Sequence, residues 1–224
     1  MASATLERFL HRARVERPPA AETAAEARTR LAEKFPRSAL RRMTHLGLLL
    51  GATLDGLDLG ADDALVYATT FAETRALEDF LSSFPAASPL LFQTSIHPGG
   101  VQQVLIGRQQ PVARLWPLAG RARLVEHALM TALLETAPRV LVVGGEERGT
   151  WLLEQNIASE RAFAFAMELT AESAGALGSV RCTPAAEQLS EDAPPALAAF
   201  AEALAERRPL AWNGAGCAWS LAWR

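Results

Sequence analysis

The stretch PVARLWPLAGRARLVEHALMTALLETAPRVLVVGGEE, residues 111–147, decides the fold. An apolar run over 112–118 ends at Gly120, and apolar residues then recur at helical spacing over 124–133. After Arg139, residues 140–143 are all apolar, with no alternation of apolar and polar residues. This pattern is typical of a parallel strand that is covered on both faces. The order strand, turn, helix, strand predicts a βαβ unit, for which a right-handed crossover is expected.

Further segments alternate between strand and helix patterns on both sides of this unit. Strands are predicted at 64–70, 162–169 and 180–183, helices at 39–53, 74–82, 101–106 and 195–207, and a hairpin at 210–224 around Asn213-Gly214. This alternation predicts an α/β layer fold around a mostly parallel sheet. Residues 1–35 are rich in Ala, Glu and Arg, and Leu6, Phe9 and Leu10 share helical spacing, so 1–35 is predicted to be a peripheral helical arm and 36–224 a single domain.

The composition argues against several classes of protein. The chain has 224 residues, half of them apolar, and a formal net charge of −3, so nothing draws it as a whole to nucleic acid or an anionic membrane. Its cysteines, Cys182 and Cys217, lack metal-ligand or CxxC spacing and are expected to be free thiols. No stretch approaches the ~20 apolar residues of a membrane span, and the N-terminus lacks a signal-peptide pattern. We therefore expect a cytoplasmic protein without metal or cofactor.

Signals for chemistry are sparse. The sequence contains neither G-x-G-x-x-G nor G-x-x-x-x-G-K-[ST], and it has no serine in G-x-S-x-G. Glu146 and Glu147 follow Gly144-Gly145 at the end of a strand, where open α/β sheets place ligands, but two glycines and two carboxylates are a weak signal and a tight turn with solvated acids is the simpler interpretation. His97, beside Pro98-Gly99-Gly100, is the best histidine candidate to line a cleft. Three acids near the helix over 74–82 are expected to be solvated: Glu73, Glu78 and Asp79.

Taken in order, these elements resemble the thiolase-fold ketosynthases. There a strand leads to a nucleophilic cysteine, a long Ala-rich helix starts at that cysteine, and the next strand ends in Gly-Gly-x-Glu, the layout of 111–147. Upstream, Arg41-Arg42-Met43 at the start of a helix stands in the same order along the chain as in these relatives. Ser95-Ile96-His97-Pro98 matches a Ser-Val-His-Asn-like loop of the short chain length factors. With the Trp-rich end over 219–224, the chain more closely resembles the short β-ketoacyl synthase chain length factors of aryl-polyene and xanthomonadin-type pigment gene clusters.

The resemblance implies a thiolase-like half, with about five strands in a mixed, mostly parallel sheet and helices on both faces. It also implies that condensation is not catalysed. The nucleophile position falls on Ala122, within the turn Gly120-Arg121-Ala122-Arg123, and a methyl group cannot form a thioester. The ketosynthase half that supplies two histidines has no counterpart in 224 residues. These relatives begin with a strand, whereas 1–35 is predicted here to be helical.

The function implied is that of a non-catalytic accessory or chain-length-factor-type protein in acyl-carrier-protein-dependent fatty acid or polyene synthesis. In the complete fold two subunits pair along the strand before the nucleophile; here that pairing strand is 113–117, with Ala113, Leu115 and Trp116. The expected partner is a ketosynthase or a second copy of the chain.

Two points stay open at this stage. Arg121 and Arg123 are candidates to meet an acyl carrier protein or a phosphopantetheine phosphate, and ordinary surface arginines fit as well. The alternative function is enzymatic: a small acyl-thioester transferase or hydrolase that uses the His97 loop with Glu146 or Glu147.

Overall fold

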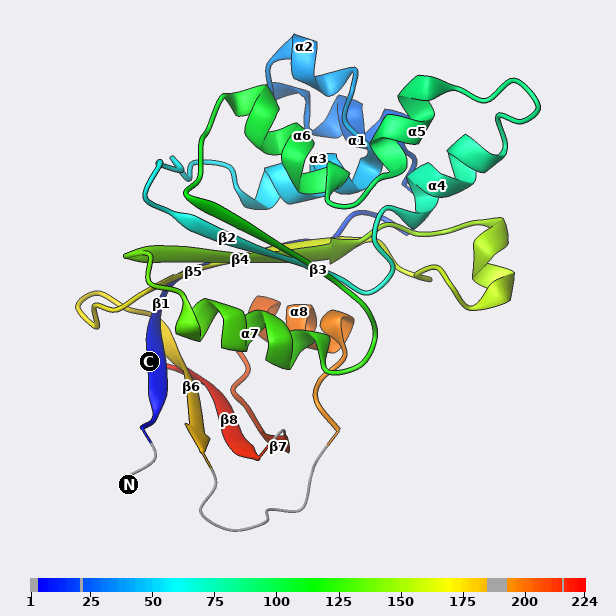
Figure 1. Ribbon diagram of the computed structural model, residues 1–224. Helices are drawn as coiled ribbons and strands as arrows, with labels where there is room; N and C mark the ends of the chain where they lie inside the picture. The colour runs from blue at the N-terminus through cyan, green and yellow to red at the C-terminus, as the bar shows by residue number, and fades with distance from the viewer. Residues whose placement is uncertain (1–3, 21, 185–192, 215) are drawn as a thin grey trace.

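The computed structural model, which describes residues 4–20, 22–184, 193–214 and 216–224, is built on one eight-stranded sheet (Figure 1). Its strand order is β3-β2-β4-β5-β1-β6-β8-β7. The strands are β1 (Leu6–Glu16), β2 (Ala64–Thr69), β3 (Arg114–Ala119), β4 (Arg139–Glu146), β5 (Phe163–Thr170), β6 (Gly178–Pro184), β7 (Leu210–Gly214) and β8 (Cys217–Trp223).

The expectation of about five mostly parallel strands is wrong. Among the described strands, only the β2–β3 and β2–β4 pairs are parallel, and the remaining pairs are antiparallel. Two features of the chain account for this. A parallel neighbour needs a crossover of about a dozen residues or more, whereas only 215–216 separate β7 from β8. β1 is inserted between β5 and β6 and runs antiparallel to both of them.

Helices cover both faces of the sheet, as predicted (Figure 1). The helices α1 to α6 lie over one face, and α7 and α8 lie over the other, where β6, β8 and β7 curve toward them. The bounds are α1 (Ala24–Arg30), α2 (Arg37–Leu40), α3 (His45–Thr53), α4 (Thr74–Leu81), α5 (Pro89–Ser95), α6 (Gly99–Arg108), α7 (Leu124–Leu134) and α8 (Leu197–Ala205), with short 3₁₀ turns η1 (Ala32–Lys34) and η2 (Trp151–Gln155).

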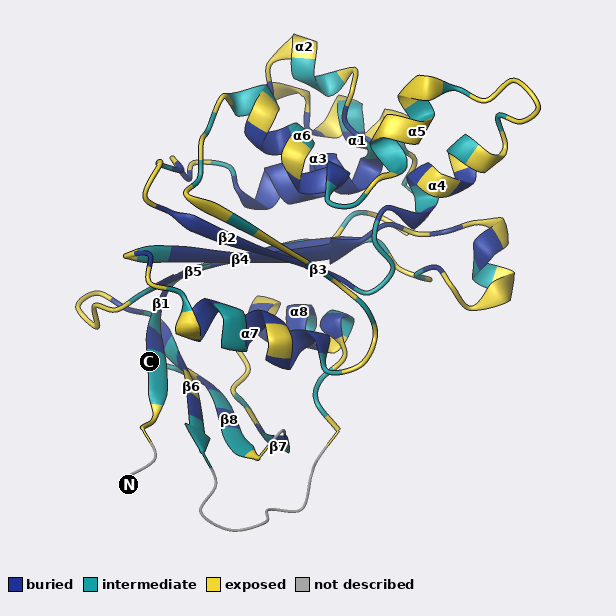
Figure 2. Cartoon of the chain, viewed as in Figure 1, coloured by how far each residue is buried: buried dark blue, intermediate teal, exposed yellow. Residues whose placement is uncertain are grey.

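The central strands belong to two apolar cores at once. Along β2, Ala64, Val66 and Ala68 pack toward α7, while Leu65 and Tyr67 pack toward α3. Figure 2 shows β2 and β4 buried along their length and β3 largely exposed. The predicted strand–helix–strand order of 111–147 is confirmed as β3–α7–β4, with β2 lying between the two strands.

The N-terminal arm predicted to be helical is wrong over Leu6–Glu16, which forms β1 in the interior of the sheet, between β5 and β6. Two features hid this strand. A register shift between Leu10 and Arg12 interrupts the alternation of side chains. A second position breaks the apolar pattern, because Arg8 is buried and donates to the carbonyls of Glu135 and Ala137 at the end of α7. The helical part of the prediction holds for α1.

The predicted C-terminal hairpin is confirmed as the antiparallel pair β7–β8. Trp212 and Trp219 stack across it, with ring centroids 5.8 Å apart. Searching the described residues for a helix long and apolar enough to span a membrane finds none.

The position of β1 predicts that Leu10→Ala destabilises the protein. Leu10 is fully buried in the core beneath α7 and α8, so its truncation should lower the free energy of unfolding by about 2–5 kcal/mol. Leu134→Ala, at a side chain that is 62% exposed, serves as the matched control and should cost much less. Denaturant titration of both variants measures the difference. Equal effects of the two changes would contradict an interior β1.

Candidate functional site

The turn between β3 and α7 has the shape that would present a side chain at the start of a helix. Gly120 has φ +145° and its N–H donates to the carbonyl of Thr69 (3.1 Å). Arg123 is left-handed, with φ +54°, and stands at the N-cap of α7. Between them Ala122 is exposed and carries no nucleophile. Cys182 and Cys217 lie elsewhere, on β6 and β8.

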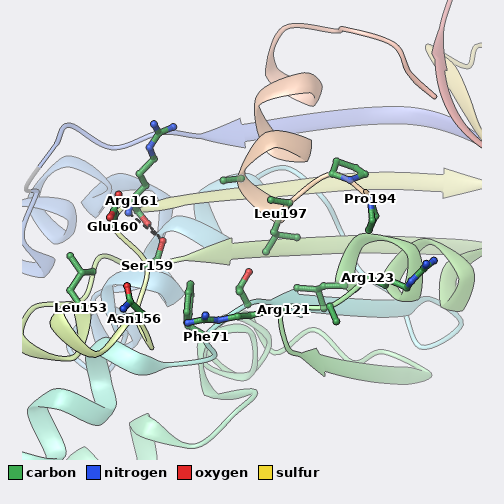
Figure 3. Close-up of a pocket in the computed structure, with 17 residues that line it drawn as sticks. Phe71, Arg121, Arg123, Leu153, Asn156, Ser159, Glu160, Arg161, Pro194 and Leu197 are labelled. Atoms are coloured by element: carbon green, nitrogen blue, oxygen red, sulfur yellow. Dashed lines mark hydrogen bonds between the residues drawn. The ribbon is translucent and has the colours of Figure 1, made fainter. Parts of the chain in front are cut away.

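A pocket of about 760 Å³ opens beside this turn (Figure 3). Its wall combines the turn with the end of β2, the loop around η2 and the segment that leads into α8. The guanidinium of Arg121 lies over the ring of Phe71, 4.8 Å from its centroid, a cation–π contact at the pocket wall. Arg121 makes no ion pair with any described residue.

Arg123 is held differently from Arg121. It donates to Glu126 (3.0 Å), which is 2% exposed and also accepts from the Trp212 indole N–H (3.0 Å). Gly214 lies against the same carboxylate, since a Cβ there would sit 2.0 Å from a Glu126 oxygen. Arg123 therefore anchors the turn to β7, while Arg121 lines the pocket without an ion pair to a described residue. Arg161 also lines the pocket, and it pairs with Glu202 (2.8 Å).

The three residues predicted to line a cleft make separate hydrogen bonds. His97 Nδ1 lies 3.1 Å from Glu73, and its ring stacks on Tyr67 at 5.0 Å. Glu146 accepts from Thr69 (3.3 Å) and from the backbone N–H of Thr70. Glu147 accepts the N–H groups of Leu46 (3.1 Å) and Ala76 (3.3 Å). A cleft shared by His97, Glu146 and Glu147 stays a prediction.

The expectation that Glu73 and Glu78 are solvated is wrong, because each is only 1% exposed, whereas Asp79 is exposed as expected. Glu73 accepts from Gly100 N–H (2.9 Å) and from the Tyr67 hydroxyl (3.2 Å). Glu78 accepts from the N–H groups of Thr150 (2.8 Å) and Leu152 (2.9 Å). Sequence analysis missed both, since several of their partners are backbone N–H groups distant in sequence, those of Gly100, Thr150 and Leu152, which no side-chain pattern reveals.

Burial shifts the protonation of these acids. Loss of solvent raises the pKa of Glu146 and that of Glu147 to about 7, against the opposing effect of the backbone N–H donors. Burial likewise raises the pKa of the Tyr67 hydroxyl, and the carboxylates of Glu73, Glu146 and Glu147 raise it further. A carboxyl that titrates near neutral pH is a group of the kind found at functional sites, although structural networks produce it as well.

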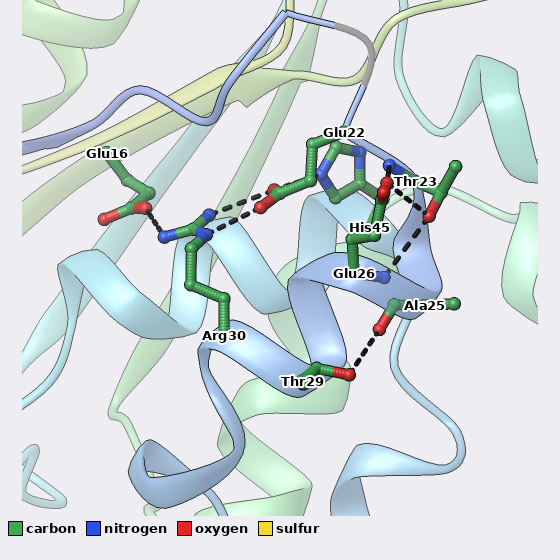
Figure 4. Close-up of polar contacts among 8 residues, drawn as sticks. All are labelled: Glu16, Glu22, Thr23, Ala25, Glu26, Thr29, Arg30 and His45. Atoms are coloured by element: carbon green, nitrogen blue, oxygen red, sulfur yellow. Dashed lines mark hydrogen bonds and ion pairs between the residues drawn. The ribbon is translucent and has the colours of Figure 1, made fainter.

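A second polar network ties the N-terminal segment to α3 (Figure 4). Glu22 accepts from Arg30 (2.6 Å) and lies 3.1 Å from His45 Nε2. Arg30 also pairs with Glu16 at the end of β1. Burial lowers the pKa of His45 despite its acidic partner, and the bond to Arg30 lowers the pKa of Glu22. No group of three or more His, Cys, Asp or Glu residues within the described chain is arranged to hold a metal ion.

Comparison with solved structures identifies the fold. One chain from the complex of a ketosynthase with its chain length factor, from Xenorhabdus doucetiae, has a TM-score of 0.66 at 20% identity, over 97% of this chain and 99% of that chain. A chain of the ishigamide ketosynthase/chain length factor has a TM-score of 0.52 at 18% identity; the match covers 67% of this chain and 51% of that chain. No protein-family model and no curated protein matches the sequence.

These similarities show a ketosynthase-like, thiolase-type fold. The first match covers both chains almost from end to end, so the matched chain is about as long as this one. In the second match, this chain spans about half of the other.

The buried position of Glu147 predicts a pH-dependent stability. Its folded pKa of about 7 lies above the ordinary 4.5, so the stabilisation by the protonated form is fully present below about pH 4.5 and is lost as pH rises to about 7. Glu147→Gln mimics the protonated acid and should remove this part of the pH dependence, on the order of 3 kcal/mol in total.

Denaturant titrations from pH 5 to 8 measure the difference between wild type and variant. The exposed Glu154→Gln provides the control and should keep the wild-type pH profile. A Glu147→Gln profile parallel to that of wild type would show that Glu147 is ionised throughout.

Proposed function

We propose that the chain is a non-catalytic, chain-length-factor-type protein that acts in association with a ketosynthase. One observation carries the proposal: in a ketosynthase-like fold, the exposed residue at the turn where the family places its nucleophile is Ala122. An alanine has neither a thiol nor a hydroxyl, so no acyl-enzyme can form at this turn. The pathway we propose is acyl-carrier-protein-dependent fatty acid or polyene synthesis of the aryl-polyene or xanthomonadin pigment type.

The exposed edge of the sheet supports association through β3. This strand pairs only with β2 among the described strands, so one side of its backbone is unpaired. Trp116 on β3 is 43% exposed, and Leu134 at the end of α7 is 62% exposed. Of the residues assigned to the pairing strand, Ala113 precedes β3, and Leu115 and Trp116 lie in it.

Pro117 limits what this edge can bind. The N–H of Gly120 donates to β2, and N–H groups alternate between the two sides of a strand, so the nitrogen of Pro117 faces the free side. A partner strand therefore finds one donor missing, which disfavours indiscriminate strand pairing. We infer that side chains at this edge, above all Trp116, supply the specificity of the contact.

The edge is also held rigid before any partner binds. Glu135 accepts from the Trp116 indole N–H (2.8 Å) and from Arg114 (2.6 Å). The Arg114 guanidinium, with further help from Trp116, lowers the pKa of Glu135 to about 2, so its carboxylate stays charged under all ordinary conditions. Less side-chain freedom is then lost on association, which favours binding.

An acyl carrier protein is a further candidate partner, and the pocket beside Arg121 is where we propose it meets the chain. Arg121 makes no ion pair with a described residue and is free to contact an acidic surface or a phosphate group.

Co-expression with each ketosynthase encoded beside the gene tests the proposal. A tag on this chain should retain one of these ketosynthases, and the double change Trp116→Glu with Leu134→Glu should reduce its recovery about tenfold or more, because both place a charge in an apolar contact. Trp151→Glu, at an equally exposed tryptophan (44%) on η2, is the control and should retain the partner. Recovery of the chain alone with every ketosynthase would contradict the proposal.

The enzymatic alternative predicts turnover, and we expect none. His97 Nε2 is buried, with no hydrogen-bond partner among the described residues, and Nδ1 is bound to Glu73, so neither nitrogen is exposed to a substrate. Purified chain mixed with acyl-coenzyme A should release no thiol above the level of His97→Ala. Thiol release that falls about tenfold or more in His97→Ala would support the hydrolase or transferase instead.

A further inference from the structure

A second pocket, of about 350 Å³, lies where α1, α3 and α4 begin and where β4 ends. Five arginines line it against three acids, on a chain whose formal net charge is −3. The arginines are Arg28, Arg41, Arg42, Arg75 and Arg148. Such a concentration of positive charge on an acidic chain calls for a specific explanation.

The three lining acids form an ion pair with only one of these described arginines, Arg75. Glu22 bonds to Arg30 and His45, which both lie in the network of Figure 4. Asp79 pairs with Arg75 (3.3 Å). Glu147 accepts two backbone N–H groups.

Most of the lining guanidinium groups are therefore available to an anion. Those of Arg41, Arg42 and Arg148 make no hydrogen bond or ion pair with any described residue, and all three residues are exposed. Arg28 donates only to the backbone carbonyls of Leu40 (3.2 Å) and Met43 (3.1 Å). One carboxylate is matched by one guanidinium, whereas a phosphate group offers several oxygens and up to two charges to several guanidinium groups at once.

A groove of about 770 Å³ continues from this pocket, and the two share Arg42, Leu90 and Thr94. Among the described residues, Arg42 is the only charged one that lines the groove. Its wall carries the amides of Gln93, Gln102 and Gln109 beside Ile106, which is 76% exposed. Amide and apolar groups suit a neutral chain rather than a second anion.

We propose that this pocket binds the phosphate group of a phosphate ester, with the neutral part of the ester in the adjoining groove. Arg42, which lines both the pocket and the groove, contacts the phosphate, and Arg41 and Arg148 contact it from the rest of the pocket wall. The proposal concerns the chain alone and does not require a ketosynthase partner.

Titration calorimetry with inorganic pyrophosphate at fixed ionic strength tests the phosphate pocket. The wild-type chain should bind, and Arg42→Gln with Arg148→Gln should weaken binding about tenfold or more. The control removes the same charge elsewhere, with Arg181→Gln and Arg208→Gln, and should change the affinity by less than about twofold. Arg42→Lys with Arg148→Lys keeps the charge and should lie between wild type and the glutamine variant.

Two further ligands test the groove. Coenzyme A joins phosphates to a chain of amides and methylenes, and ATP joins them to a nucleoside. Tighter binding of one of them than of pyrophosphate supports the groove and identifies the type of ester. No binding of pyrophosphate, or equal weakening by the pocket and control variants, would overturn the phosphate site; equal affinity for all three ligands would overturn the role of the groove.

Discussion

Four buried glutamates hold together the end of the sheet on which the rest of this structure depends. Glu73, Glu78, Glu146 and Glu147 are each 1–3% exposed, and each accepts at least one backbone N–H from a segment distant in sequence. Glu147 alone receives N–H groups from the first turns of both α3 and α4. A buried N–H left without a partner costs about 1–3 kcal/mol, so these carboxylates stabilise the loops that shape the pockets.

The turn between β3 and α7 lies at the same end of the sheet, and it carries no nucleophilic side chain at Ala122. The turn of Gly120 to Arg123 keeps a sharp backbone and an 11-residue helix behind it, and Arg123 is locked through Glu126 to β7. What remains is the geometry for presenting a nucleophile, with Ala122 in its place and Arg121 beside a pocket. Under the function proposed above, this turn serves binding.

The elements with uninterrupted periodicity were predictable from sequence. β3, α7 and β4 follow from their apolar patterns, and the burial of β2 and β4 on both faces follows from the lack of alternation. β1 was not predictable, because the irregular register at Leu10 and the buried Arg8 both disrupt its pattern. The strand count depends on antiparallel pairing of short segments, which local patterns do not reveal. The buried glutamates form contacts such as Glu147 with Leu46, 101 residues apart, that no local pattern encodes.

Hydrogen–deuterium exchange of the chain, alone and with a co-purified ketosynthase, tests most directly the proposal that this chain associates with a ketosynthase through β3. The account predicts slower exchange over Arg114–Ala119 in the complex, because the free side of β3 becomes covered. The outward N–H groups of this strand have no partner strand among the described residues, so protection there would report the contact itself. A complex that forms while exchange over Arg114–Ala119 stays unchanged would contradict the account.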